Sequence, residues 1–304
     1  MTVSHEKNGG NIMELLIDCI PCLLRQSLEA ARMATDRAES HNKIMKETIK
    51  LLSDYENYKN SPELAREIHK LVRNETGSQD PYLQVKQRDL QAAEDLYPFL
   101  KNFLQSKKNS IYWALKIAAT GNNLDSAVYS DLELETCVGN ELEKEFSVCD
   151  LDVFTEKLHR AENILIIGDN TGETIFDRVM LESFPDVTIT YGVRNEPIIN
   201  DVTEKEAIAS GLNTVARVVS TGCGAPGAIL SDCSDEFVDI YNKSDIIISK
   251  GQGNFEALSE EQGNLFFLLK AKCPAIARKF HVNVNDYVFC LRQNKPVKTG
   301  VKEW

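Results

Sequence analysis

The chain has 304 residues, enough for a large hydrophobic core and two subdomains. Its net charge of −12 argues against a nucleic-acid partner, because phosphate backbones are bound by basic surfaces. No apolar run reaches the roughly 18 residues of a membrane-spanning helix, and residues 1–10 are too polar for a signal peptide. We therefore expect a cytoplasmic globular protein without a membrane partner, and the sequence leaves its oligomeric state open.

Residues 11–125 have the apolar spacing of helices and no strand pattern, so we expect an all-helical subdomain. A third helix should begin with Ser61 as its cap and Pro62 in its first turn, and end at Gly77. A fourth should begin after Pro81 and end before Pro98, because proline interrupts a helix. The other expected helices run from about 15 to 31, from His41 to Ser53 and from Ile111 to Thr120.

Residues 126–304 are expected to form a second domain. The acidic segment from Asp125 to about Ser147 is weakly patterned and is predicted to be a connector, followed by a helix from Asp150 to Arg160. Strands and helices then alternate, which predicts a Rossmann-like, mostly parallel sheet covered by helices. The expected strands are Asn163–Gly168, Val187–Val193, Ala216–Ser220, Ile246–Ser249 and Tyr287–Leu291, and the expected helices are Glu173–Phe184, Thr203–Ser210 and Phe255–Ala271.

The strand Asn163–Gly168 is the centre of the predicted site. Its unbroken apolar run is typical of a strand buried on both faces, and parallel sheets bind ligands at the carboxyl ends of such strands. Asp169 and Asn170 follow there, and their carboxylate and amide oxygens suit Mg²⁺ or Mn²⁺ better than a thiolate zinc site. Asp169 or Thr171 could instead cap the next helix, so this stretch alone leaves a metal site and a helix cap equally open.

Three further predicted strands end in polar or glycine-rich loops. Asn200 and Asp201 again join an amide to a carboxylate, although Asp201 could also be a plain helix cap. The loop Gly222–Gly227 could bind an anion through backbone N–H groups, or be an ordinary turn. Lys250 precedes two glycines and a helix, where an ammonium could bind phosphate.

Together these strand ends predict a site for a metal ion and a phosphate, for which phosphoryl hydrolysis is the simplest chemistry. The lysine lies before the glycines, so the pattern is not a Walker A motif, and no G-x-G-x-x-G supports a dinucleotide site.

The eight cysteines contain one notable pair, Cys19-Ile-Pro-Cys22, with the spacing of redox and zinc motifs. No second such pair exists, so structural thiols are favoured while redox or metal use stays open. We expect Cys149, Cys273 and Cys290 to be small buried hydrophobic residues.

Taken together, these segments resemble the damage-control phosphatase family, formerly domain of unknown function 89, in its stand-alone prokaryotic type. The resemblance spans nearly the whole chain. It is carried, in order, by Cys19–Cys22, Asp80-Pro-Tyr with Lys86, Gly121-Asn122 with Asp125, Gly168–Glu173, Asn200-Asp201, Gly222–Gly227 and Lys250–Asn254.

The resemblance implies a helical subdomain packed on a Rossmann-like domain, and a divalent cation (Mn²⁺, Ni²⁺, Co²⁺ or Mg²⁺) held by Asp169, Asn170 and Asp201. It also implies that Lys250 contacts phosphate. The activity it implies is metal-dependent hydrolysis of small phosphometabolites, such as sugar phosphates or damaged cofactor precursors. One departure is Arg194-Asn-Glu-Pro197, a bulky charged turn where relatives are expected to have a small one, which could reshape the pocket.

Further roles follow for residues around this site. Asp201 could orient or deprotonate a water molecule as well as bind the cation. Backbone amides near Gly222 would help Lys250 to neutralise the phosphoryl oxygens. Glu173 could support the metal ligands or only favour the helix dipole. Asn122 and Asp125 could close over the substrate.

Two other functions are compatible with parts of the sequence. A Rossmann-like sheet could bind S-adenosylmethionine for carboxyl methylation, or Cys19 and Cys22 could organise a thiol- or zinc-linked binding module. The carboxylate and amide groups and the lysine at the strand ends match a cationic sulfonium cofactor poorly, and a thiol- or zinc-linked module leaves the oxygen-rich strand ends unexplained.

Overall fold

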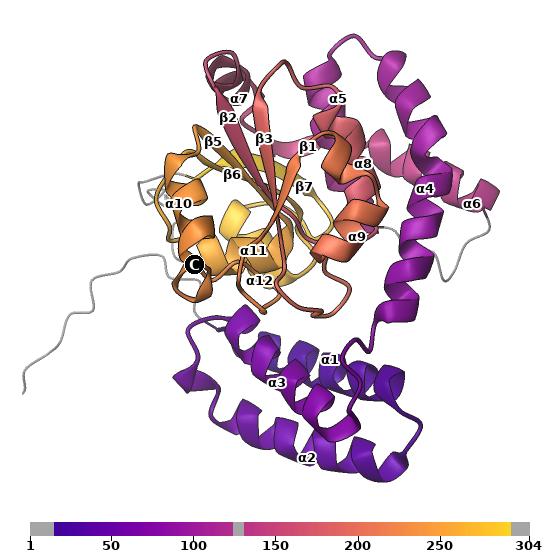
Figure 1. Cartoon of the computed structure of the whole chain (residues 1–304), viewed down its shortest axis with the longest axis vertical. Helices are drawn as coiled ribbons and strands as arrows, with labels where there is room; N and C mark the ends of the chain where they lie inside the picture. The colour runs from indigo at the N-terminus through magenta and orange to yellow at the C-terminus, as the bar shows by residue number, and fades with distance from the viewer. Residues whose placement is uncertain (1–14, 124–130, 293–304) are drawn as a thin grey trace, which may run out of the picture.

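The computed structural model describes residues 15–123 and 131–292. Within these residues, seven strands form one sheet covered by helices on both faces, and a unit of three helices lies across one end of the sheet (Figure 1). The predicted α/β fold is confirmed. Among the residues described, no helix combines the length and apolar character needed to cross a bilayer.

The strands follow the order β1-β7-β6-β5-β2-β3-β4, with β2 and β5 in the middle. Each described neighbouring pair is parallel except β6 and β7, which run antiparallel. The bounds are β1 Phe146–Cys149, β2 Asn163–Ile167, β3 Thr188–Val193, β4 Arg217–Ser220, β5 Ile246–Lys250, β6 Leu265–Lys270 and β7 Tyr287–Leu291.

The helices of the first half are α1 Cys19–Ala34, α2 Ala38–Ser53, α3 Ser61–Thr76, α4 Leu83–Gln105 and α5 Ser110–Thr120. Those of the second half are α6 Asp131–Leu142, α7 Leu151–Leu158, α8 Glu173–Leu181, α9 Glu204–Ala209, α10 Asp235–Lys243, α11 Gly251–Leu258 and α12 Pro274–Phe280.

The central strand β2 is buried on both faces, as its sequence predicts. Ile164 and Ile166 join the core beneath α4, α5 and α8, whereas Leu165 and Ile167 join the core beneath α10, α11 and α12. Alternate side chains of a strand point to opposite faces, so an unbroken apolar run supplies both cores at once.

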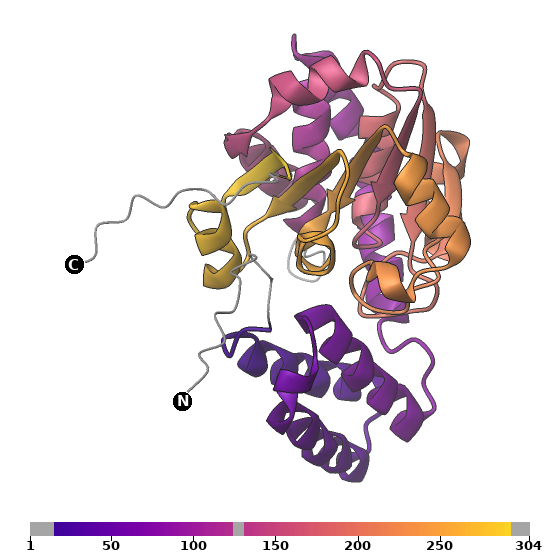
Figure 2. The same cartoon turned by 90° about the vertical axis from the view of Figure 1, so that its left-hand side faces the viewer.

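The helical region is divided between two packing units. Helices α1, α2 and α3 pack on one another around two small cores of their own. Helices α4 and α5 share the large core of the sheet, and the views of Figures 1 and 2 show α4 leading from one unit to the other. The boundary expected at 125 and 126 lies outside the described residues.

Two helix ends differ from the prediction. The cap of α3 is Asn60, whose side chain accepts the Glu63 N–H at 3.0 Å, so Ser61 is the first helical residue. Helix α4 continues through Pro98. The buried residues Leu96, Leu100 and Leu104 anchor it to the sheet on both sides of the proline, and this packing outweighs one lost backbone hydrogen bond.

Two segments of the second half were assigned wrongly. The predicted helix Phe255–Ala271 is α11, a turn at Gly263 and the fully buried strand β6. A short apolar run fits a buried strand or a buried helix equally well, and Gly263 was the signal that separates them. The predicted connector contains α6 and β1.

Candidate active site

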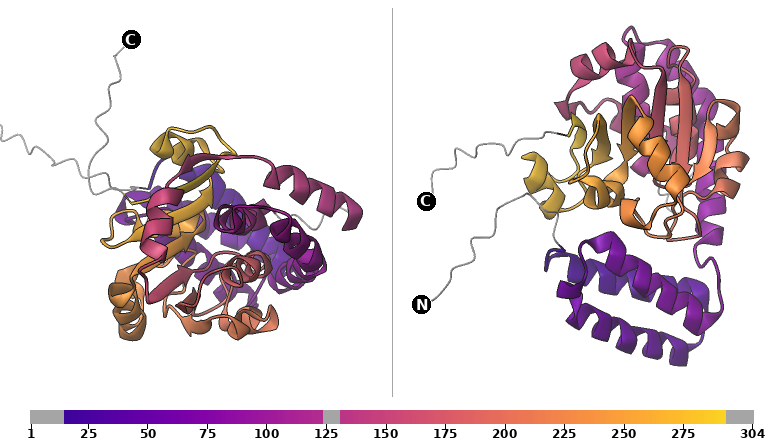
Figure 3. Two further views of the ribbon diagram at one scale, coloured as in Figure 1. Left: turned by 90° about the horizontal axis from the view of Figure 1, so that it is seen from above. Right: turned by 60° about the vertical axis from the view of Figure 1, so that its left-hand side comes forward.

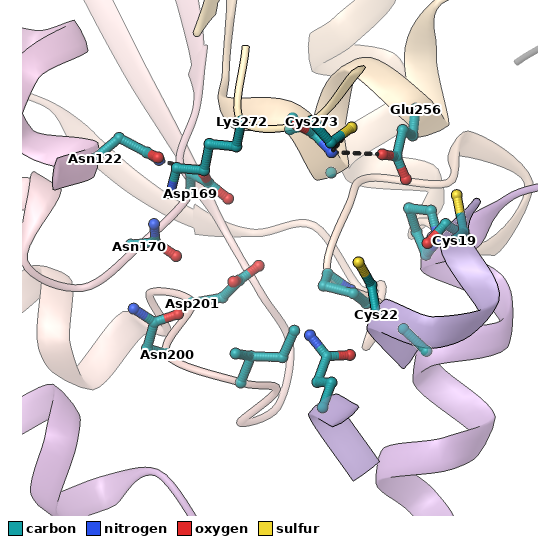
Figure 4. A pocket seen from close by; sticks show the side chains of 18 of the residues that line it. Cys19, Cys22, Asn122, Asp169, Asn170, Asn200, Asp201, Glu256, Lys272 and Cys273 are labelled. Atoms are coloured by element: carbon teal, nitrogen blue, oxygen red, sulfur yellow. Dashed lines mark hydrogen bonds between the residues drawn. The ribbon is translucent and has the colours of Figure 1, made fainter. Parts of the chain in front are cut away.

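A cavity of about 970 Å³ lies between the three-helix unit and the carboxyl ends of the strands. Figure 3 shows the arrangement of these parts of the fold, and Figure 4 shows side chains that line the cavity. The sheet domain contributes the loops after β2, β3 and β6 and the start of α11. The three-helix unit contributes residues of the first two turns of α1 and α3. Its wall includes Cys19, Cys22, Gln26, Asn122, Asp169, Asn170, Asn200, Asp201, Gln252, Glu256, Lys272 and Cys273.

Asp169 and Asp201 are brought together by backbone hydrogen bonds between the loops that follow β2 and β3. The Val202 N–H donates to the carbonyl of Asp169 at 2.8 Å, and the Thr171 N–H donates to that of Asn200 at 2.8 Å. Both carboxylates are consequently buried, with exposed fractions of 8% and 3%.

The structure removes the alternative that these two aspartates only cap helices. The residue before α8 is Gly172, and no side chain caps that helix. Helix α9 is capped by Thr203 and Glu206, which form a capping box. Asp169 and Asp201 are therefore available for another role.

Burial and neighbouring negative charge both raise the pKa values of Asp169 and Asp201. Burial, together with the charges of Glu173 and Asp201, raises the pKa of Asp169 well above its ordinary value. Burial also raises the pKa of Asp201, although Arg194 opposes this shift. The Arg194 Nε donates to Asp201 Oδ2 at 2.7 Å, and its Nη2 lies 4.0 Å from Asp169 Oδ1. Facing buried carboxylates are stabilised by a cation between them.

Lys250 does not reach the cavity wall in this structure. Its ammonium is fully buried beneath the site, 2.7 Å from Glu173 Oε2 and 2.6 Å from Asp177 Oδ1. These two carboxylates raise its pKa against the effect of burial. Tyr191 also donates its hydroxyl to Asp177 at 2.7 Å, which completes a buried polar network under the site.

Glu173 connects this network to the amides of the site. The Asn170 Nδ2 donates to Glu173 Oε1 at 3.0 Å, and the Asn122 Nδ2 donates to Asp169 Oδ2 at 3.0 Å and also to Glu173. These hydrogen bonds fix the orientation of both amides, so the Asn170 oxygen is the atom left for a ligand. Glu173 thus supports the predicted ligands.

The close approach of α11 to Asp169 requires a glycine. Gly251 has φ +77°, and a Cβ at this position would lie 1.8 Å from Asp169 Oδ2. The glycine that follows Lys250 therefore makes room for the carboxylate.

Gly222, which was predicted to bind the substrate, does not line the cavity. Gly222 lines a separate pocket of about 330 Å³ with Asn195, Ser220 and Ser234. Its φ of +79° and a Cβ position 2.6 Å from the Ser234 nitrogen explain the glycine by the turn alone. Asp125 lies outside the described residues.

The structure adds a cation that the sequence prediction missed. Lys272 lines the cavity beside Asp169 (Figure 4). Its positive charge lowers the pKa of Asp169 and so opposes part of the rise that burial causes. It follows β6, the strand mistaken for a helix. Correct assignment of β6 would have identified Lys272 as another polar residue just beyond a strand end. Arg278 also lines the cavity, but its guanidinium pairs with Asp18 at 3.1 Å.

The charged turn Arg194–Pro197 contacts the three-helix unit. Arg73 of α3 donates to Glu196 Oε1 at 2.7 Å and to the Pro197 carbonyl at 3.0 Å. This turn therefore joins the two units, and it does not line the cavity.

The cysteines depart from the expected burial. Cys149 is exposed, and Cys273 and Cys290 are only partly buried. Cys149 lies on the solvent side of β1, a strand at the edge of the sheet.

The donor set fits a hard divalent cation. Asp169, Asp201 and the Asn170 amide supply oxygen atoms at one end of the cavity, and such atoms suit Mg²⁺ or Mn²⁺. Within the described residues, no three His, Cys, Asp or Glu side chains form a metal-binding group.

Paired carboxylates and a lysine at the strand ends of a Rossmann-like sheet are the features of a hydrolase that acts on phosphate esters. The model of the damage-control phosphatase ARMT1-like domain matches residues 15–288, and the chain belongs to this family. The family consists of phosphatases that act on small or damaged phosphometabolites, so the prediction of a phosphatase is confirmed.

The chain is 34% identical to a damage-control phosphatase of Pyrococcus horikoshii, over 92% of this chain and 98% of that protein. It is 30% identical to a damage-control phosphatase of Archaeoglobus fulgidus, over 89% and 96%. The crystal structure of a DUF89 family protein from Pyrococcus horikoshii superposes with a TM-score of 0.85 at 33% identity, covering 92% of this chain and 99% of the other.

Proposed function

We propose that the protein hydrolyses phosphate monoesters of small metabolites with the help of a divalent cation held by Asp169, Asn170 and Asp201. The observation that carries the proposal is the pair of buried carboxylates at one end of a cavity whose wall also holds Lys272. When bound, the cation would supply Lewis-acid chemistry and lower the pKa of a water molecule.

The residues around the cation have separate tasks. Arg194 holds Asp201 Oδ2, which leaves the other oxygen of this carboxylate for the cation or for orienting water. Lys272, whose side chain is exposed, supplies a positive charge for the phosphoryl oxygens, on which negative charge accumulates during transfer. Lys250 acts indirectly, by fixing Glu173 and through it the amides of Asn122 and Asn170.

The size of the cavity indicates the substrate class. About 970 Å³ is near the upper end of small-ligand sites and far exceeds the volume of a phosphate group. The remaining space, lined by Gln26, Gln252 and Glu256, would accept a sugar or a cofactor fragment.

The test is phosphate release by chelator-treated protein, supplied in turn with Mn²⁺, Ni²⁺, Co²⁺ or Mg²⁺. A panel of sugar phosphates and cofactor precursors would be compared with p-nitrophenyl phosphate. We expect activity only with added metal, and loss of it in Asp169→Asn. Activity that survives chelation, or that Asp169→Asn retains, would contradict the proposal.

A further inference from the structure

Of the eight cysteines, all of which lie within the described residues, three line the substrate cavity. Cys19 and Cys22 belong to the first turn of α1, and Cys273 precedes α12. In the view of Figure 4 their side chains lie on the opposite side of the cavity from Asp169 and Asn170. Thiolates are poor ligands for a hard cation, so the proposed hydrolysis gives them no task.

Cys19 and Cys22 are placed where a disulfide can close. Residues three apart on a helix have Cβ atoms about 5–6 Å apart, and a disulfide needs about 4 Å. The first turn can supply this change of about 1–2 Å in the Cβ separation, because its N–H groups have no partners within the helix. Those of Cys19 and Ile20 donate to the carbonyls of Leu16 and Ile17, in the short turn before the helix, at 2.8 and 3.1 Å. The residue before α1, Asp18, makes no side-chain cap that would stiffen the turn.

The two thiols differ in accessibility. Cys22 is exposed, whereas Cys19 is partly buried. Burial, followed by the charge of Glu256, raises the pKa of Cys19 to about 11, so this thiol stays protonated at neutral pH. An oxidant in the cavity therefore reacts first at Cys22, with Cys19 three residues away as the partner.

We propose that Cys19 and Cys22 form a modification site for hydroperoxides, an oxidisable pair of thiols in the wall of the substrate cavity. The Cys22 thiolate attacks a peroxide oxygen, the O–O bond breaks, and the products are a Cys22 sulfenic acid and an alcohol, or water from hydrogen peroxide. The Cys19 sulfur then attacks the Cys22 sulfur, the disulfide forms, and water leaves. Two thiols lose two electrons, and the peroxide gains them.

The disulfide has a consequence for the substrate, and this part rests on the proposed function. Closing it draws the Cys22 sulfur toward Cys19 and reshapes the wall that contacts the alcohol part of the substrate. The carboxylates at the other end of the cavity keep their places. We therefore expect KM to rise at least threefold with little change in kcat, and a dithiol reductant to reverse the effect.

The first measurement is peptide mapping of the full chain after graded exposure to hydrogen peroxide and alkylation. We expect a Cys19–Cys22 disulfide to form before Cys149, an exposed cysteine outside the cavity, is oxidised. In Cys19→Ser, Cys22 should proceed to the sulfinic acid instead. Equal rates at Cys22 and Cys149 without this disulfide, or oxidation confined to Cys223 and Cys233, would overturn the proposal.

The second measurement is phosphatase kinetics before and after oxidation. The Cys19→Ser/Cys22→Ser variant, compared with its own untreated sample, should not respond to peroxide. A mapped disulfide that leaves KM unchanged would overturn the link to the substrate. Reduced protein without phosphatase activity under any metal would count against the proposed function alone, because the mapping decides the thiol chemistry independently.

Discussion

Lys250 and Glu173 form a fully buried ion pair, with 2.7 Å between Nζ and Oε2, directly beneath the amides of the active site. The two lysines at the strand ends, Lys250 and Lys272, therefore have different surroundings. Lys250 holds the site in shape from below, whereas Lys272 faces the cavity.

Substitution of Lys250 should mainly lower stability, whereas substitution of Lys272 should mainly raise KM. Lys250→Met leaves Glu173 and Asp177 buried without their cation, so the free energy of unfolding should fall by about 3–5 kcal/mol. Lys272→Met removes an exposed charge and should cost little stability, but KM for phosphate esters should rise about tenfold or more. Urea unfolding and steady-state kinetics measure both effects. A silent Lys272→Met variant would remove this residue from the site.

Asp169→Asn and Asp201→Asn should each abolish metal binding while the fold is kept. Because burial and like charge raise the pKa of Asp169, Asp169→Asn should leave thermal stability without metal unchanged or higher. Asp201→Asn should lower it, because the buried guanidinium of Arg194 loses the carboxylate with which it pairs. Activity should fall by about a thousandfold or more, since several kcal/mol of transition-state stabilisation are lost. Calorimetric metal titration and thermal unfolding are the measurements. Near-normal turnover in either variant would show that the ligands are assigned wrongly.

Gly251→Ala should damage the site far more than its backbone angle alone explains. The new methyl group would collide with Asp169, so we expect metal affinity to be lost. Gly77→Ala is a matched control, because Gly77 has almost the same φ, +76°, and its Cβ position has no neighbour within 4 Å among the described residues. It should cost only about 1 kcal/mol of strain. Equal effects of the two substitutions on metal binding would refute the steric explanation.

Glu256 should make stability depend on pH. Burial raises its pKa from 4.5 to about 7, so the folded protein binds this proton more tightly than the unfolded chain does. The contribution of this proton to the free energy of unfolding is fully present below pH 4.5. It decreases as the pH rises through 7 and is constant above that. Glu256→Gln should therefore match the wild type at pH 4.5 and exceed it at pH 8, by no more than about 3 kcal/mol. Urea unfolding at both pH values tests this, and a constant difference would contradict it.

Much of the sheet and part of the site could be predicted because their signals are local. The apolar run before Asp169 identifies β2 by itself, and the pairing of β2 with β3 follows from the order of strands. The role of Lys250 could not be predicted, because its direction depends on Asp177, a residue that looks like an ordinary helix position. Lys272 could not be predicted because β6 was not recognised: its run of five apolar residues has no periodicity that distinguishes a strand from a helix.

The contact between Arg73 and Glu196 has a consequence for access to the cavity. Part of the cavity wall, eight of its 28 lining residues, belongs to the three-helix unit, whose cores are separate from that of the sheet. The unit is attached to the sheet domain partly through ion pairs, Arg73 with Glu196 and Arg66 with Asp232. Dissolved salt screens such partly exposed pairs. We therefore expect higher ionic strength to loosen the attachment of the three-helix unit, and with it one wall of the cavity, in addition to weakening the attraction of a charged substrate.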